Sequence, residues 1–205
     1  MKAVVVGGGF SGLATASLLS ARGFNVTLVE KNASIGGRAR VLEEKGYKFD
    51  MGPSWYLMPE VFENLFASLG KARPYEVVKL SPSFKLTIDW KKDILIYPDL
   101  SENKEELNKL EDRGFEKMEK YLETTGFMYE VATKKFLYRE YRGLRDFLTK
   151  EVLVDALRLG LLENLERFNR KFFKSEDMLK LTGFASVFLG GSPDLIPGLY
   201  ALVNY

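Results

Sequence analysis

The sequence KAVVVGGGFSG at residues 2–12 decides the fold of this chain. Residues 3–6 form a β-branched apolar run, typical of a strand that is buried on both faces of a parallel sheet. The glycines that follow satisfy the pattern G-x-G-x-x-G at Gly7, Gly9 and Gly12. Gly7 permits a tight turn, Gly9 lets the backbone approach a pyrophosphate, and Gly12 lets a helix pack closely on the strand. The stretch therefore predicts a strand, a phosphate-binding turn and a helix.

A helix and a second strand are predicted after the glycine turn. Apolar residues between positions 13 and 22 favour the helix, and Gly23 suits the left-handed residue that ends it. Residues 25–29, NVTLV, predict a strand that leads to Glu30. A carboxylate at this position accepts a hydrogen bond from the ribose 2′-hydroxyl of a dinucleotide and repels the 2′-phosphate of NADP. The residues thus predict a βαβ dinucleotide-binding unit that does not take NADP.

The uncharged run of residues 3–21 also has the look of a signal peptide or a membrane span. Three consecutive glycines inside such a helix would each cost about 1 kcal/mol relative to alanine. Their spacing is explained by nucleotide binding, so we reject the targeting interpretation.

The amino-acid composition excludes several kinds of catalytic and metal-binding site. The chain has 205 residues, a formal net charge of +2, and neither cysteine nor histidine. Disulfides, thiol nucleophiles, Cys/His zinc sites and catalytic triads with a histidine base are therefore excluded, and we expect no metal site. The weak net charge gives no reason to expect a nucleic-acid partner. Redox or other demanding chemistry would have to come from a cofactor.

A second glycine motif follows the predicted βαβ unit. Gly37 and Arg38, in the sequence GGR, combine close backbone approach with a guanidinium that can bind phosphate oxygens. Standing a few residues after the ribose carboxylate, they are predicted to form a second clamp on the dinucleotide. Residues 39–50 predict a hairpin that turns at Lys45 and Gly46.

An irregular aromatic loop and a helix come next. Residues 51–59 contain two prolines and a glycine, which interrupt regular structure. Trp55, Tyr56 and Met58 in this loop either pack against the domain or line an apolar ligand site beside the cofactor. Residues 59–69 predict an amphipathic helix, with Val61, Phe62, Leu65, Phe66 and Leu69 on one face.

The second part of the chain, residues 81–205, is predicted to be a separate domain from residues 1–80. Strands are expected at 84–89 and 94–97, then a solvated, densely charged helix from Ser101 to Lys120. Helical spacing continues to residue 173, and its apolar and aromatic positions are Phe127, Tyr129, Phe136, Tyr138, Tyr141, Phe147, Leu148, Val152, Ala156, Leu159, Leu162, Phe168, Phe172 and Phe173. They suit core packing or, because lysine and arginine are in excess from 131 to 180, an anionic membrane surface. No segment is expected to span a membrane.

The whole chain resembles the N-terminal part of bacterial and archaeal phytoene (carotenoid) desaturases, members of the FAD-dependent amine-oxidase-like superfamily. The resemblance lies in GGGFSGLATASLLSARGFNVTLVEKNASIGGRA, in FDMGPSWYLMPEVFENLF, and in the later SPSFKLTI and FLGGSPDLIPGLYALVNY. It implies an α/β fold in which a Rossmann-type FAD-binding βαβ unit carries an inserted β-strand and helical substrate portion. It also implies FAD held by Gly7, Gly9, Ser11, Gly12, Glu30, Gly37, Arg38, Gly52, Pro53 and Ser54.

The reaction implied by the resemblance is dehydrogenation of a long apolar polyisoprenoid such as phytoene, by hydride transfer to the flavin. Family members are more than twice as long, so we expect a missing C-terminal half, supplied by a partner, or self-association. The expected location is the cytoplasm, with peripheral contact at the inner membrane face. No catalytic residue is assigned, because Asp50, Arg139 and Arg142 are candidates only as polar residues near apolar stretches, and structural ion pairing suits each of them better than proton transfer.

Three alternatives stay open at this point. The chain could be part of a carotenoid isomerase, or of another flavin oxidoreductase of the same superfamily that acts on amines or other lipids. It could instead be a non-catalytic nucleotide- or lipid-binding subunit. An NAD dehydrogenase fits less well, because neither the GGR motif nor the loop GPSWYLMP has a role in it.

Overall fold

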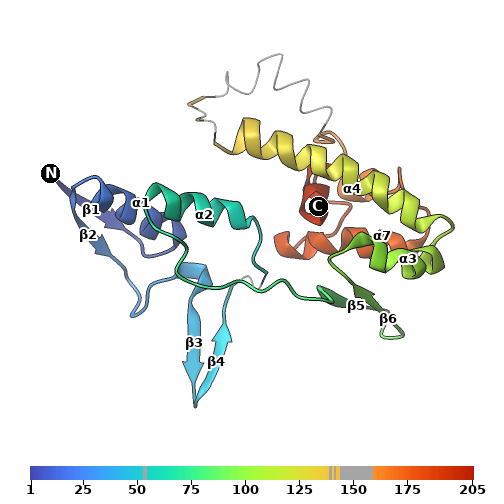
Figure 1. Ribbon diagram of the computed structural model, residues 1–205, viewed down its shortest axis with the longest axis horizontal. Helices are drawn as coiled ribbons and strands as arrows, with labels where there is room; N and C mark the ends of the chain where they lie inside the picture. Colours follow the sequence, from blue (N-terminus) through green and yellow to red (C-terminus); the bar gives the residue numbers. More distant parts are fainter. Residues whose placement is uncertain (53–54, 139, 141, 144–158) are drawn as a thin grey trace. The chain divides into compact units, whose positions relative to one another are not determined.

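A computed structural model describes residues 1–52, 55–138, 140, 142–143 and 159–205 (Figure 1). The chain divides into two compact units, unit 1 (Met1–Val78) and unit 2 (Lys79–Tyr205), close to the boundary predicted between residues 80 and 81. The elements of unit 1 are β1 (Lys2–Val6), α1 (Phe10–Ala21), β2 (Asn25–Val29), η1 (Gly37–Ala39), β3 (Val41–Glu44), β4 (Tyr47–Asp50) and α2 (Pro59–Ser68). Those of unit 2 are β5 (Phe84–Ile88), β6 (Lys92–Ile96), η2 (Leu100–Asn103), α3 (Lys104–Leu110), α4 (Gly114–Val131), η3 (Ala132–Leu137), α6 (Leu165–Asn169), α7 (Glu176–Gly183), η5 (Phe184–Leu189) and η6 (Gly198–Asn204).

The predicted βαβ unit is present at the start of unit 1. Strands β1 and β2 pair in parallel, with Lys2 opposite Asn25 at the first position. Helix α1 connects them and ends as expected, with Gly23 in the left-handed region at a φ of +84°. The next backbone N–H, of Phe24, donates to the Leu19 carbonyl at 3.1 Å, which satisfies a carbonyl of the last helical turn.

The environment of β1 differs from the prediction. Val4 is 68% exposed and Val6 is 83% exposed, so β1 is not buried on both faces. Its other face carries Val5, which lies beneath α1. Within the described residues β1 hydrogen-bonds to one strand alone, β2, and the sheet has two strands. The prediction was wrong because a β-branched run indicates how apolar a strand is, and not which elements of the same chain cover it.

The remaining elements of unit 1 follow the predicted pattern. Strands β3 and β4 form an antiparallel hairpin, and Lys45 and Gly46 both have positive φ at its turn. This is the geometry of a two-residue hairpin turn of the favoured handedness. Helix α2 begins at Pro59 and is amphipathic, because the five apolar residues predicted to share a face are half-buried while its polar residues are exposed.

Unit 2 begins with an antiparallel hairpin, β5–β6, followed by two helices where one charged helix was expected. Helix α3 ends at Leu110, and Arg113 has a φ of +55° before α4 begins at Gly114. A Cβ atom at Gly114 would overlap the carbonyl oxygen of Leu107 and lie 2.7 Å from its carbonyl carbon. The glycine therefore allows α4 to start against the end of α3 (Figure 1).

The core of unit 2 is rich in aromatic rings. Tyr121 on α4 is fully buried, with the rings of Phe172 and Phe173 each 5.3 Å from its own ring and that of Phe168 at 6.1 Å. Three predicted helical-face positions, Phe127, Tyr138 and Leu162, are more than half exposed. The predicted positions Tyr141, Phe147, Leu148, Val152 and Ala156 lie outside the described residues. No described helix has both the length and the apolar character that crossing a membrane requires.

Candidate dinucleotide-binding site

The glycine-rich turn of unit 1 is built by close backbone approach. Gly7 has a φ of +103° and its N–H donates to the Val29 carbonyl at 2.7 Å, which joins the end of β1 to the end of β2. A Cβ atom at Gly12 would overlap the Gly7 carbonyl oxygen and lie 3.0 Å from the Gly7 carbonyl carbon. Only glycine at position 12 lets the first turn of α1 lie this close to β1.

The first turn of α1 can receive an anion. Gly9 is the N-cap residue, no side chain caps the helix, and its first turn has no acidic residue. The N–H groups of Phe10, Ser11 and Gly12 belong to the helix positions that have no intrahelical acceptor. A Cβ atom at Gly9 would meet nothing closer than the Gly37 Cα at 3.9 Å, so the space above this backbone is open. The cradle therefore fits a phosphate group at the positive end of the helix dipole.

Glu30 is fixed against the glycine turn. Its Oε2 accepts from the Gly8 N–H at 2.6 Å, and its Oε1 accepts from the backbone N–H of Asn32 at 2.9 Å and from Asn32 Nδ2 at 2.6 Å. The hydrogen bonds from the Asn32 and Gly8 backbones lower the pKa of Glu30, so this carboxylate is ionised at neutral pH. Two carboxylate oxygens have about four acceptor sites, which leaves capacity for a ribose hydroxyl.

The GGR segment lies against the same turn. The Gly36 N–H donates to the Gly8 carbonyl at 2.7 Å, and Gly37 has a φ of +61°. A Cβ atom at Gly37 would lie 3.1 Å from the Gly9 Cα, so the two glycine segments are in backbone contact. Arg40 stabilises this turn by donating from Nη1 to the Gly37 carbonyl at 3.1 Å.

The end of the β3–β4 hairpin returns to GGR. A Cβ atom at Gly52 would lie 2.5 Å from the Arg38 carbonyl oxygen and 2.9 Å from the Ala39 Cα, and the Met51 N–H donates to the Arg40 carbonyl at 3.1 Å. Arg38 itself is exposed. The structure thus brings together eight of the predicted cofactor residues, namely Gly7, Gly9, Ser11, Gly12, Glu30, Gly37, Arg38 and Gly52. The other two, Pro53 and Ser54, lie outside the described residues.

An aromatic cluster joins the start of α1 to the loop before α2. Phe62 packs edge-on against Phe10 at 5.9 Å between ring centroids and stacks on Tyr56 at 4.9 Å. The hydroxyl groups of Tyr56 and Tyr75 are 2.8 Å apart. Tyr56 is therefore a packing residue of unit 1. For Tyr56 this favours packing against the domain over lining an apolar ligand site.

Two of the three candidate acid–base residues, Asp50 and Arg142, lie among the described residues. Asp50 is exposed at the end of β4, opposite Val41. Arg142 forms an exposed ion pair with Glu140 at 2.9 Å, and Arg139 lies outside the described residues. No proton acceptor follows from these positions.

Sequence reasoning missed four residues of the site: Gly8, Phe10, Asn32 and Arg40. Gly8 was hidden as the variable position of G-x-G, and Asn32 could have been found from the tendency of Asn to hydrogen-bond to nearby groups two residues away. Phe10 and Arg40 act through contacts that no local pattern indicates.

Comparison with known proteins extends these observations. Residues 5–72 match the family of NAD(P)-binding Rossmann-like domains. The chain is 37% identical over 204 residues to the carotenoid 3,4-desaturase of Haloarcula japonica, covering 98% of this chain and 41% of that protein. It is 34% identical over 207 residues to the phytoene desaturase of Cercospora nicotianae, covering 99% of this chain and 33% of that protein. The chain therefore spans no more than about two fifths of the length of these relatives.

A solved structure has a similar fold. A redesigned cofactor-binding variant of putrescine oxidase aligns with a TM-score of 0.53 at 15% identity, covering 98% of this chain and 40% of that chain. The comparisons confirm the Rossmann-type α/β dinucleotide-binding fold and the resemblance, along the whole chain, to carotenoid and phytoene desaturases.

Proposed function

We propose that this chain is the dinucleotide-binding part, with a portion of the substrate domain, of an FAD-dependent carotenoid desaturase. The observation that carries the proposal is the backbone contact of Gly9 with Gly37 beside the ionised Glu30, in a chain similar along its length to carotenoid desaturases. The glycine turn alone would suit any dinucleotide, whereas its contact with GGR supports a second clamp on the cofactor.

Each residue of the cradle has a role in this proposal. The N–H groups at the start of α1, including that of Ser11, would bind the pyrophosphate, and Gly7, Gly9 and Gly12 give it room. Glu30 would accept from the adenosine ribose, and Arg38, next to Gly37, would bind a central phosphate oxygen. Gly52, with Pro53 and Ser54, would lie toward the flavin end.

When bound to these residues, a flavin would supply the two-electron acceptor that the dehydrogenation needs. The chain itself would bind and orient the cofactor, and the ionised Glu30 would exclude a cofactor with a 2′-phosphate. A carotenoid such as phytoene has no polar group, so its binding would depend on apolar burial at about 25 cal/mol per Å². We propose that the rest of the relatives' length, or a second copy of this chain, completes that site, with peripheral contact at the cytoplasmic membrane face.

Cofactor binding is tested by titrating the purified 205-residue chain with FAD while following flavin fluorescence. We expect one FAD per chain, and NADP to compete at least tenfold more weakly than NAD. Glu30→Gln should reduce that discrimination, because it removes the charge that repels the 2′-phosphate. Binding of neither FAD nor ADP, in a chain shown to be folded by circular dichroism, would contradict the cofactor assignment.

Turnover is tested by co-expressing the chain with the C-terminal three fifths of the Haloarcula carotenoid desaturase in cells that make phytoene. A coloured product with a longer conjugated system supports desaturation, and a geometric isomer of unchanged conjugation would support an isomerase. Oxidation of an amine by the same assembly would favour another flavin oxidoreductase. FAD binding without any turnover would favour a non-catalytic subunit.

A further inference from the structure

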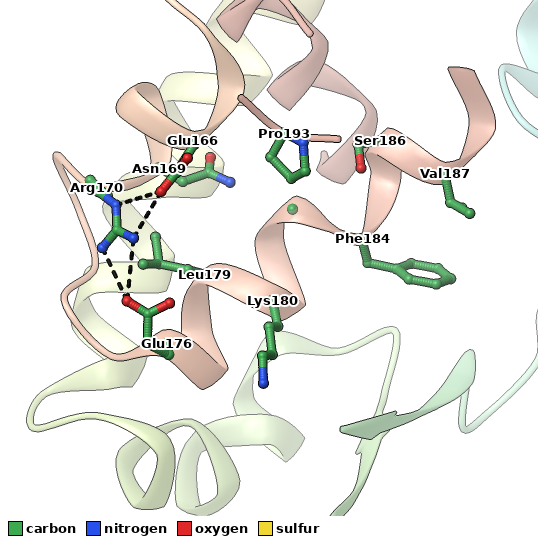
Figure 2. A pocket seen from close by; sticks show the side chains of 11 residues that line it. Glu166, Asn169, Arg170, Glu176, Leu179, Lys180, Phe184, Ser186, Val187 and Pro193 are labelled. Carbon is green, nitrogen blue, oxygen red and sulfur yellow. Dashed lines mark hydrogen bonds and ion pairs between the residues drawn. The ribbon is translucent and has the colours of Figure 1, made fainter. Parts of the chain in front are cut away.

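Unit 2 contains a pocket that the proposed function does not use. Its volume is about 400 Å³, within the usual size of small-molecule sites, and its lining comes from α6, α7, η5 and the segment before η6 (Figure 2). All of its lining residues belong to unit 2. None of the predicted dinucleotide-binding residues lines it, so an inference about this pocket does not depend on the proposed function.

One wall of the pocket carries an unused hydrogen-bond donor. Asn169, at the end of α6, is 1% exposed, and its Nδ2 is buried with no hydrogen-bond partner among the described residues. Figure 2 shows this amide nitrogen directed toward the space beside Pro193. A buried donor without an acceptor destabilises the folded chain, and an acceptor on a bound ligand would remove that cost.

The Asn169 side-chain amide is held in place by a buried network of hydrogen bonds. Tyr121 donates its hydroxyl to Asn169 Oδ1 at 3.1 Å, and Asn204 donates from Nδ2 to the Tyr121 hydroxyl at 2.8 Å. Asn204 also donates to the Thr182 carbonyl at 2.8 Å. Burial raises the pKa of Tyr121, so its hydroxyl keeps its proton and remains a donor to Asn169. This hydrogen-bond network fixes which end of the Asn169 amide faces the pocket.

The charged side chains that line the pocket all form ion pairs. Arg170 forms ion pairs with Glu166 at 2.8 Å and with Glu176 at 3.2 Å, and Lys180 forms one with Asp89 at 2.7 Å. A charged ligand would have to compete with these pairs, whereas a neutral one would leave them intact. Phe184, Val187 and Pro193 provide apolar surface in the pocket (Figure 2).

The geometry points to a binding site for a small neutral molecule that presents a carbonyl or hydroxyl oxygen to Asn169 Nδ2. Its apolar body lies against Phe184, Val187 and Pro193. The oxygen accepts the hydrogen bond that the folded chain leaves unmade, and the paired charges at the rim exclude ionic ligands. The ligand class is therefore a compact ketone, amide or alcohol with an apolar skeleton.

The test uses two molecules of nearly equal shape, acetophenone and ethylbenzene, which differ in the carbonyl oxygen. Each is titrated into the ¹⁵N-labelled full chain, and chemical shifts are followed for the amides of α6, α7 and η5 and for the Asn169 side-chain NH₂. We expect saturable shifts at these positions and a two- to tenfold lower Kd for acetophenone, the range of one net hydrogen bond. Equal affinities would overturn the hydrogen-bonded site, and shifts elsewhere or no saturation would overturn the pocket.

Two variants complete the design. Asn169→Asp keeps an acceptor for the Tyr121 hydroxyl and removes the donor, so the preference for acetophenone should disappear. Val187→Trp fills the pocket from a position that is 59% exposed, where the larger side chain leaves the core unchanged, and should weaken both ligands at least fivefold. Unchanged binding in Val187→Trp would refute the location even if Asn169→Asp fails to fold.

Discussion

Gly9→Ala separates dinucleotide binding from folding. Gly9 has a φ of −81° and a ψ of −175°, which alanine adopts without strain, and its nearest neighbour to an added Cβ is the Gly37 Cα at 3.9 Å. The substitution therefore meets ordinary van der Waals contact in the folded chain. The methyl group would instead enter the open space above the first turn of α1, where we place the pyrophosphate.

The expected magnitudes follow from this geometry. Replacing a glycine at a compatible backbone position stabilises a protein by about 0.4–1 kcal/mol, since the unfolded chain loses conformational freedom. We therefore expect Gly9→Ala to unfold at the same urea concentration as the parent chain or at a slightly higher one. Its affinity for FAD should fall at least tenfold, about 1.4 kcal/mol, because the methyl group keeps the phosphate from the backbone N–H groups.

Gly12→Ala is the matched control, because it adds the same methyl group at a position where the folded chain has no room for it. Its methyl group would overlap the Gly7 carbonyl oxygen, so α1 must move away from β1, at the roughly 1–3 kcal/mol typical of overpacking. Urea unfolding followed by circular dichroism, together with FAD titration, measures both effects in both variants. Unchanged FAD affinity in Gly9→Ala would refute the proposed position of the pyrophosphate. Full stability in Gly12→Ala would refute the close packing of the helix on the strand.

Three further predictions rest on side-chain hydrogen bonds. The pKa of Glu30 is lowered in the folded chain, so the stability that the Glu30 carboxylate contributes is present above its unfolded pKa and is lost as pH falls through its folded pKa. Urea midpoints measured from about pH 6 to about pH 3 should therefore fall less steeply in Glu30→Gln than in the parent chain. Arg40→Leu removes the bond to the Gly37 carbonyl and should weaken FAD binding about two- to tenfold in the same titration, with little change in urea midpoint; a midpoint shift without an affinity change would assign Arg40 to folding instead. Tyr121→Phe leaves Asn169 Oδ1 without its donor and should lower the free energy of unfolding by about 1–3 kcal/mol, whereas an unchanged urea midpoint would show that this bond is replaced.

Much of unit 1 could be predicted because its signals are local. The glycine turn, Gly23 and the Lys45–Gly46 turn each demand a backbone conformation that few residues adopt, so the sequence names them directly. The alternation of half-buried and exposed positions in α2 follows from helical period alone. The packing role of Gly12 could also be predicted, because it depends only on the absence of a side chain at that one position.

The other features of the fold depend on contacts between residues that are far apart in the sequence, and such contacts produce no periodic pattern in it. Tyr121 meets Asn169 and Asn204 through hydrogen bonds that span 48 and 83 residues, and nothing near Tyr121 distinguishes it from the other aromatic positions of its helix. The division between α3 and α4 depends on how Gly114 meets the Leu107 carbonyl, while charge patterning across the same region indicated only a solvated surface.

The dinucleotide cradle draws its contacts from a short length of chain. Every backbone approach described for it, from Gly7 to Gly52, joins residues within the first 52 positions of the sequence. Contacts of low sequence separation form quickly, because little loop entropy is lost in closing them. During synthesis, the cradle can therefore assemble as soon as β4 has left the ribosome, while unit 2 is still being translated. The turn that we propose to bind the cofactor phosphates would then be formed before the aromatic core around Tyr121 exists.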